Sequence, residues 1–125
     1  MKSCYELFGI ECGPGWIDLY APLIERCEKE GVTILQIKEK FGGLRFYVGA
    51  ASDELHDAIE AACKRSYTVC ERCGQPGRLY NDGWMQTLCV GHATVASKKT
   101  YAKTVEEASQ EVVDAMKTAP RVKKS

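Results

Sequence analysis

Residues 70–92 read CERCGQPGRLYNDGWMQTLCVGH, a stretch with a metal-ligand pattern at its two ends. Cys70 and Cys73 form C-x2-C, and Cys89 and His92 form C-x2-H after a gap of fifteen residues. Two ligands three positions apart converge on one ion from a tight turn, and the longer gap accommodates a hairpin that brings back the second pair. The spacing predicts a tetrahedral Zn2+ site.

The segment between the two pairs has the pattern of a β-hairpin. Residues 78–80 and 84–88 flank Asn81-Asp82-Gly83, and an Asp-Gly step is a strong signal for a tight turn between strands. We therefore expect residues 70–93 to form a module resembling a zinc ribbon.

The ligand count favours a structural metal over a catalytic one. A catalytic zinc keeps an open coordination position, which four protein ligands would fill. The nucleobase deaminase signature fails, because His56 is not followed by x-Glu and Val69 rather than proline precedes the C-x2-C. An HNH-type nuclease would need a histidine in the hairpin, and none lies between Cys73 and Cys89. We expect a protein that is not an enzyme.

The preceding residues predict two helices and a hairpin. Apolar residues recur at helical spacing from Trp16 to Cys27, with Pro22 tolerable near the first turn if Asp18 is the N-cap. Ser52 is the expected N-cap of a second helix, whose apolar stripe runs from Leu55 to Ser66. Residues 32–38 and 44–48 read as strands around Phe41-Gly42-Gly43. Their predicted inner face consists of Thr33, Leu35, Ile37, Leu44, Phe46 and Val48.

Polar, cationic and aromatic residues would then lie on the other face and tip of this hairpin. Two adjacent glycines permit a turn and close approach of a partner backbone or phosphate. Cationic and aromatic side chains of this kind can bind single-stranded nucleic acid, but an ordinary hairpin with a solvated cationic face is the simpler explanation. The candidate binding residues, including those on the zinc module, are Lys38, Lys40, Arg45, Tyr47, Arg72, Arg78 and Trp84.

The C-terminal segment has its own signature. Thr104-x-x-Glu107 is a capping box, and it opens a predicted helix with a narrow stripe of small apolar residues suited to docking. The complete expectation is an α+β fold, in which a short antiparallel hairpin packs with two helices. The chain divides into a scaffold at 1–69, the zinc-ribbon-like module at 70–93, and a C-terminal helix with a basic tail at 94–125.

Composition limits the classes of function. The chain has 125 residues, 17 basic and 17 acidic side chains and no long apolar run, which favours a cytoplasmic protein without a membrane partner. Seven cysteines, three of them in a metal pattern, favour a reducing compartment over a disulfide framework. The zero net charge argues against strong non-specific binding to nucleic acid.

Three features together resemble small uncharacterised proteins of bacteriophages and bacteria. These are Gly15-Trp16, the run QIKEKFGGLRFY at residues 36–47, and the metal pattern of residues 70–92. The resemblance covers about residues 12–93 and implies context without an established activity. It suggests a protein that binds a host or phage protein complex, including inhibitors of bacterial defence systems. The leading hypothesis is thus a zinc-stabilised binding protein for protein–protein interaction, and the alternative is a nucleic-acid-binding zinc-ribbon module.

Overall fold

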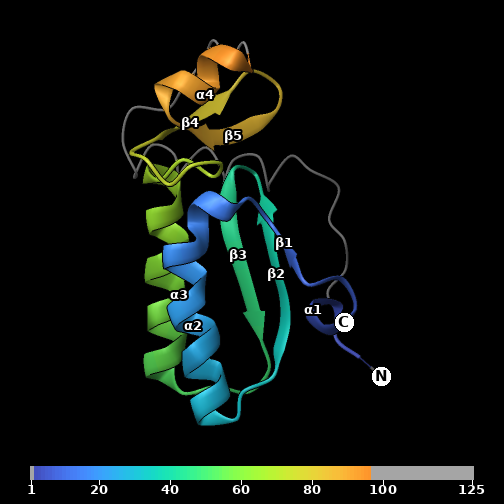
Figure 1. Ribbon diagram of the computed structural model, residues 1–125. Coiled ribbons are helices and arrows are strands. Elements are labelled where there is room, and N and C mark those ends of the chain that lie inside the picture. The colour runs from blue at the N-terminus through green and yellow to red at the C-terminus, as the bar shows by residue number, and fades with distance from the viewer. Residues whose placement is uncertain (1, 97–125) are drawn as a thin grey trace.

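The computed structural model describes residues 2–96, and the helix predicted from Thr104 lies outside the described residues. Within 2–96 the fold is α+β, as the sequence predicted. Two long helices pack against a three-stranded mixed sheet, and a module built from a two-stranded hairpin and a short helix sits at one end of that sheet (Figure 1). No helix in this part of the chain is long and apolar enough to cross a membrane.

The two long helices are α2 (Ile17–Glu30) and α3 (Asp53–Arg65). Ser52 caps α3 as predicted, because its side chain accepts a hydrogen bond from the backbone N–H of Leu55. The prediction that Asp18 caps α2 was wrong. The short 3-10 helix η1 (Pro14–Trp16) leads directly into α2, which places Pro22 inside the helix at an exposed position.

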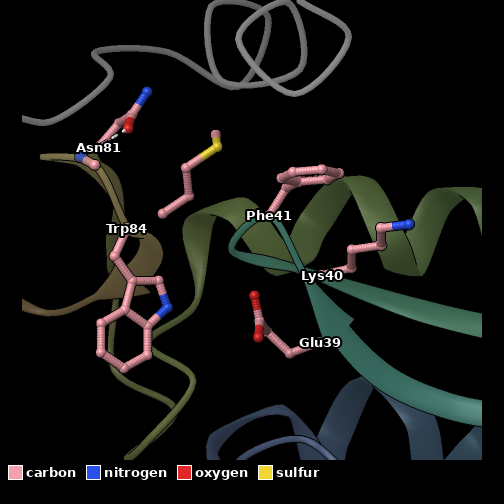
Figure 2. A pocket seen from close by; sticks show the side chains of 7 residues that line it. Glu39, Lys40, Phe41, Asn81 and Trp84 are labelled. Atoms are coloured by element: carbon pink, nitrogen blue, oxygen red, sulfur yellow. Dashed lines mark hydrogen bonds between the residues drawn. The ribbon is translucent and has the colours of Figure 1, made fainter. Parts of the chain in front are cut away.

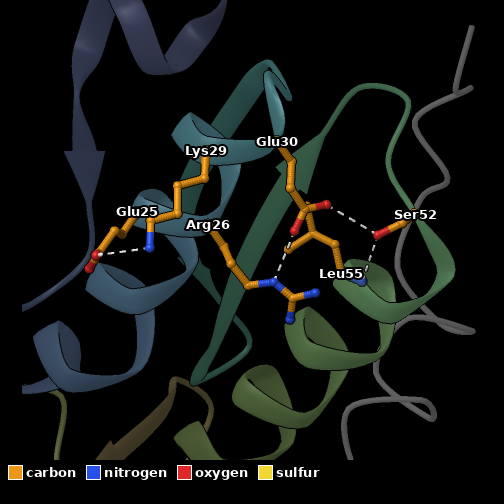
Figure 3. Close-up of polar contacts among 6 residues, drawn as sticks. All are labelled: Glu25, Arg26, Lys29, Glu30, Ser52 and Leu55. Atoms are coloured by element: carbon orange, nitrogen blue, oxygen red, sulfur yellow. Dashed lines mark hydrogen bonds and ion pairs between the residues drawn. The ribbon is translucent and has the colours of Figure 1, made fainter.

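At the end farther from the module, α2 and the start of α3 are joined by side chains (Figure 3). Glu30 accepts a hydrogen bond from the Ser52 hydroxyl at 3.2 Å and pairs with Arg26 at 3.0 Å. Lys29 lies 3.9 Å from Glu25 on the outside of α2. Exposed pairs of this kind contribute only ~0.5 kcal/mol each, so the alignment of the helices depends mainly on their buried faces.

The sheet has the order β1-β2-β3. β2 (Ile34–Lys40) and β3 (Gly43–Val48) form the predicted antiparallel hairpin, and β1 (Ile10–Glu11) adds a parallel edge to β2. The short helix α1 (Cys4–Phe8) precedes β1 and lies against β2. Neither α1 nor β1 was predicted, because two to five residues carry too little periodicity to identify an element.

The predicted inner face of β2 was partly wrong. A bulge interrupts the pairing between Ile34 and Gln36, so one extra residue changes which side chains point inward. Ile34 and Ile37 are buried, whereas Leu35 and Thr33 are exposed. On β3 the alternation holds, with Leu44 and Phe46 buried as predicted.

The outer edge of β3 is covered by the end of α3. The Ser66 hydroxyl accepts a hydrogen bond from the Leu44 N–H at 2.9 Å and donates one to the Cys63 carbonyl at 2.5 Å. The next outward-pointing N–H, that of Phe46, bonds the Cys63 thiol. This closes an edge that would otherwise be open to pairing with another strand.

The core between sheet and helices is apolar and continuous. It includes the helix stripes that the sequence predicted, and Trp16, Ile37, Leu44 and Leu55 have no exposed surface. The module continues from α3 through the 3-10 helix η2 (Ser66–Thr68). It consists of β4 (Arg78–Asn81), β5 (Met85–Leu88) and α4 (Val90–Val95).

Candidate metal centre and the adjoining cleft

Cys70, Cys73, Cys89 and His92 form one cluster. Their candidate ligand atoms all lie within 4.8 Å of one another, so the four residues could hold a metal ion. His92 Nδ1 lies 3.5 Å from the Cys70 sulfur and 3.3 Å from the Cys89 sulfur, and the sulfurs of Cys73 and Cys89 are 3.7 Å apart. All four predicted ligands are brought together, although 22 positions separate Cys70 from His92.

The two ligand pairs are presented by different local structures. Cys70 and Cys73 lie on a turn closed by a 2.9 Å hydrogen bond from the Gly74 N–H to the Cys70 carbonyl. Gly74 has φ +82, a conformation that side chains rarely adopt. Cys89 is the N-cap of α4, and its sulfur accepts from the His92 N–H at 3.5 Å. The second pair therefore sits at the start of a helix, a feature that the ribbon-like prediction did not include.

The protein environment favours a thiolate at Cys70. Burial by itself would raise the pKa of this thiol, but hydrogen bonds from the backbone at Cys89, Cys73 and Arg72 outweigh it and lower the pKa from 9.0 to about 6. A metal ion binds the thiolate form of cysteine, so this arrangement prepares one ligand before a metal arrives.

The first ligand turn rests on the start of η1. Gly15 N–H donates to the Glu71 carbonyl at 2.7 Å, and Gly13 N–H donates to the Glu71 carboxylate at 2.9 Å. The indole of Trp16 donates to the Val69 carbonyl at 2.8 Å. A Cβ on Gly15 would overlap the Cys70 carbonyl oxygen, so only glycine allows the two backbones to approach this closely.

The tip of the β2–β3 hairpin supports the module from another direction. Its turn residues Phe41 and Gly42 both have positive φ, at 55° and 79°. The Gly42 carbonyl accepts a 2.6 Å hydrogen bond from the buried hydroxyl of Thr87 on β5, and a Cβ on Gly42 would overlap Leu79 on β4. A Cβ on Gly43 would overlap the ring of Tyr67. Within the protein, Gly42 allows close approach of the module and Gly43 allows close approach of Tyr67 on η2.

Segments that lie far apart in the chain thus contact one another where the scaffold meets the module. The segment around Trp16 contacts one side of the metal-bearing module, and the hairpin tip contacts another. A small cluster of Phe41, Tyr67, Leu79 and Met85 fills the space beside the hairpin tip. The candidate metal site is therefore packed against the scaffold at two places.

A cleft of about 490 Å³ opens between this hairpin tip and the β4–β5 turn (Figure 2). The Trp84 side chain, 67% exposed, lies on the side of the β4–β5 turn, and Glu39 lies on the opposite side with its carboxylate toward the cleft. The residues that line the cleft are Glu39, Lys40, Phe41, Asn81, Gly83, Trp84 and Met85.

The candidate binding residues lie in three places. Lys40 and Trp84 line the cleft, and Lys40 Nζ sits 5.5 Å from the centre of the Phe41 ring. Arg72 and Arg78 are exposed on the module. Lys38, Arg45 and Tyr47 lie on the sheet, where Lys38 pairs with Arg45 and Gln36 pairs with Tyr47.

The sheet face is less cationic than the sequence suggested. β1 places Glu11 beside Lys38, and Gln36 donates to the Glu11 carboxylate at 3.4 Å. Arg45 forms a side-chain hydrogen bond with Tyr67, whose hydroxyl pKa is nevertheless raised because burial outweighs the arginine charge. Glu11 was missed because nothing in the sequence pairs residues 10–11 with β2.

Sequence reasoning also missed five residues of the cleft. Glu39 and Phe41 were read only as parts of the first hairpin, Asn81 and Gly83 only as parts of the turn after residues 78–80, and Met85 as part of a strand. The Phe-Gly-Gly turn was the one sequence signal that pointed to this cleft. The strand packed against that turn is β5, whose Thr87 is 45 positions from Gly42 in the chain, so the sequence did not reveal the contact. No protein-family model, curated protein or solved structure matches this chain.

Proposed function

We propose that this chain is a zinc-stabilised binding protein, not an enzyme, that engages a protein complex through the cleft between the β4–β5 turn of its metal-binding module and the tip of the β2–β3 hairpin. The observation that carries the proposal is the position of that cleft: the β4–β5 turn, at the end of its hairpin opposite the four candidate ligands, forms one wall and the β2–β3 hairpin tip forms the other. A metal that holds the module in place therefore also holds the cleft in shape.

Zinc is the ion that best suits the cluster. Three thiolates and one imidazole are typical ligands of structural zinc, with Zn–S near 2.3 Å and Zn–N near 2.0 Å. In a tetrahedron these bond lengths place sulfurs about 3.8 Å apart and sulfur about 3.5 Å from nitrogen. The separations of 3.7, 3.5 and 3.3 Å lie close to those values.

The ligand set supports a structural role for the ion. When Cys70, Cys73, Cys89 and His92 all bind, a tetrahedral ion keeps no position for water or substrate. His56, the other histidine of the chain, is exposed on α3. The ion would contribute folding energy to the module, as structural zinc does in other small domains.

A protein partner fits the composition of the cleft. Trp84 is an exposed aromatic side chain that lines the cleft together with Phe41 and Met85, and aromatic residues set in pockets carry much of the binding energy at protein interfaces. The proposal that the partner is a host or phage complex, including one of a bacterial defence system, rests on the resemblance of Gly15-Trp16, of residues 36–47 and of the metal-ligand pattern to phage and bacterial proteins.

A comparative pull-down tests the proposal. Zinc-loaded wild type, Trp84→Ala and Phe8→Ala would be immobilised and exposed to nuclease-treated bacterial lysate, with retained proteins quantified by mass spectrometry. Phe8 is a matched control, because it is also an aromatic side chain with 67% exposure but lies on α1. We expect wild type and Phe8→Ala to retain the same complex, and Trp84→Ala to lose it.

Folding and metal content are checked first by circular dichroism and zinc analysis. The complex would then be purified and its binding to each variant repeated by gel filtration. If the folded zinc-loaded wild type retains no specific complex, or if Trp84→Ala retains it fully, the cleft is not the binding surface and the proposal fails.

The alternative is a nucleic-acid-binding module that uses the sheet face. It is favoured by the cross-strand pairs Lys38 with Arg45 and Gln36 with Tyr47. It is disfavoured by the negative charge of Glu11, which pairs with Lys38 on the neighbouring strand β1. Filter binding of single-stranded DNA across salt concentrations tests it. Affinity that falls steeply with salt and drops in Lys38→Gln would support this alternative, and no binding at low salt would remove it.

A further inference from the structure

The geometry points to a positively charged side chain, arginine in the first place, as the group that the partner inserts into the cleft beside Trp84. This inference rests on the proposed function and names the chemistry that the cleft recognises. It is carried by the combination of a carboxylate and aromatic walls within one concave site.

The carboxylate is that of Glu39, and the protein holds it in position. Its Oε2 atom accepts a 2.8 Å hydrogen bond from the Gly42 N–H, within the hairpin turn. Among residues 2–96, the ion pairs are Arg26–Glu30, Lys29–Glu25 and Lys64–Glu60, and none includes Glu39. One oxygen is thus anchored to the backbone, and the negative charge has no cationic side chain bound to it in this part of the chain.

The aromatic wall for a cation is Trp84. Indole is the best cation–π acceptor among the side chains, and Trp84 exposes 67% of its surface. Phe41 contributes apolar surface, but Lys40 already lies over its ring at 5.5 Å. Figure 2 shows the Lys40 ammonium extending away from Trp84, which leaves Glu39 on the side of the cleft that faces the indole.

Arginine suits this pair better than other groups. Its planar guanidinium can stack on an indole while its edge donates hydrogen bonds to a carboxylate, and it loses less hydration than an ammonium group. A phosphate would be repelled by the Glu39 charge. A lysine should bind more weakly, because an ammonium cannot stack and donate along a flat edge at the same time.

The test uses full-length, zinc-loaded, 15N-labelled protein and the probe N-acetyl-L-arginine amide. Binding is followed from the indole N–H signal of Trp84. Trp16 provides an internal reference, because its indole is fully buried and bonded to the Val69 carbonyl. N-acetyl-L-citrulline amide, which has nearly the same shape without the charge, is the control ligand.

We expect arginine amide to shift the Trp84 signal in a saturable way and citrulline amide to bind about tenfold more weakly, the difference that a lost charge-assisted contact produces. Glu39→Gln should weaken arginine binding at least about fivefold. Glu28→Gln is the matched variant, since Glu28 is an exposed acid at the far end of α2 and its removal should change nothing.

Several results would overturn the inference. Equal binding of citrulline, or unchanged affinity in Glu39→Gln, would show that charge is not recognised. A Trp84 shift with oligothymidylate but not with arginine amide would assign the cleft to nucleic acid. The spectra of two ligand-free variants, Arg121→Gln and Glu39→Gln, would also be compared. If both substitutions moved the Trp84 signal to the same new position, the occupant of the cleft would be Arg121 of the chain itself and not a partner.

The two proposals fail in distinguishable ways. If arginine amide does not bind but Trp84→Ala still loses the captured complex, the charge inference falls and the binding function stands. If arginine amide binds at Trp84 but the captured complex is the same in wild type and Trp84→Ala, the cleft recognises a cation without being the surface for that complex.

Discussion

The indole N–H of Trp16 donates a 2.8 Å hydrogen bond to the carbonyl oxygen of Val69, the residue immediately before the first metal ligand. Trp16 has no exposed surface, so this bond joins the interior of the scaffold to the base of the metal-bearing module. Folding of the scaffold and placement of Cys70 are therefore coupled.

Trp16→Phe should lower the free energy of unfolding by about 2–4 kcal/mol, because it leaves a cavity and removes the partner of a half-buried carbonyl. Urea denaturation measures the change. Trp84→Phe, at an exposed position, should change stability by less than about 0.5 kcal/mol. Equal effects of the two substitutions would contradict the coupling between Trp16 and the module.

Gly42→Ala should destabilise the protein more than Gly31→Ala does. Both glycines have positive φ, at +79° and +68°, so both substitutions introduce backbone strain of about 1 kcal/mol. Only at Gly42 would the new Cβ overlap another side chain, that of Leu79, while Gly31 faces open space. We expect a further loss of about 1–3 kcal/mol at Gly42, measured by thermal or urea denaturation. Similar losses at both sites would show that the hairpin tip is not tightly seated.

With zinc bound as proposed, its removal by a chelator, or the substitution Cys73→Ser, should abolish hydrogen-exchange protection in residues 70–92. The loss should extend to the Gly15 amide, because its acceptor is the Glu71 carbonyl on the ligand turn. Ile59 in the middle of α3 serves as the reference amide, since its hydrogen bond lies within the helix. Unchanged protection at residues 70–92 after verified metal loss would show that the ion does not support the module.

Stability should fall as the pH rises above about 9, with Cys12 as one cause. Burial, followed by the nearby charges of Glu71 and Glu39, raises the pKa of this thiol from 9.0 to about 12. Between these two pKa values the unfolded chain has lost the thiol proton and the folded chain retains it. Each pH unit in this range therefore lowers the free energy of unfolding by up to about 1.4 kcal/mol.

The measurement is urea denaturation of wild type and Cys12→Ala at about pH 8 and about pH 10, on either side of the ordinary thiol pKa. Other buried thiols and tyrosines titrate in the same direction, so the difference between the two proteins isolates Cys12. We expect Cys12→Ala to lose less stability on the alkaline side. Parallel losses in both proteins would exclude a contribution from Cys12.

The parts of the fold that were predicted correctly are those encoded over short distances in the chain. The helix stripes from Leu19 to Cys27 and from Leu55 to Ala62 follow a 3.6-residue period, and both are largely buried. The failures have local causes that periodicity does not reveal. The bulge near Leu35 shifts the alternation by one residue, and η1 starts α2 earlier than a capping rule based on Asp18 allows.

The candidate metal site was predicted completely, whereas the cleft was not. The spacing of Cys70 and Cys73, and that of Cys89 and His92, is typical of metal ligands. The metal-binding residues can therefore be recognised from the sequence without knowledge of the fold. The cleft needs Glu39 and Trp84 to face one another, and no spacing rule relates two residues on separate hairpins.

The amino-acid sequence by itself determined the four ligands, the hairpin between them and the two amphipathic helices, because each depends on residues close together in the chain. Only the tertiary structure decided what Gly42 and Gly43 approach, how Glu11 joins the sheet, and where the cleft opens. Those features depend on contacts such as that between Gly42 and Thr87, 45 positions apart. Burial and backbone hydrogen bonding of the whole chain select such contacts, and a local pattern does not encode them.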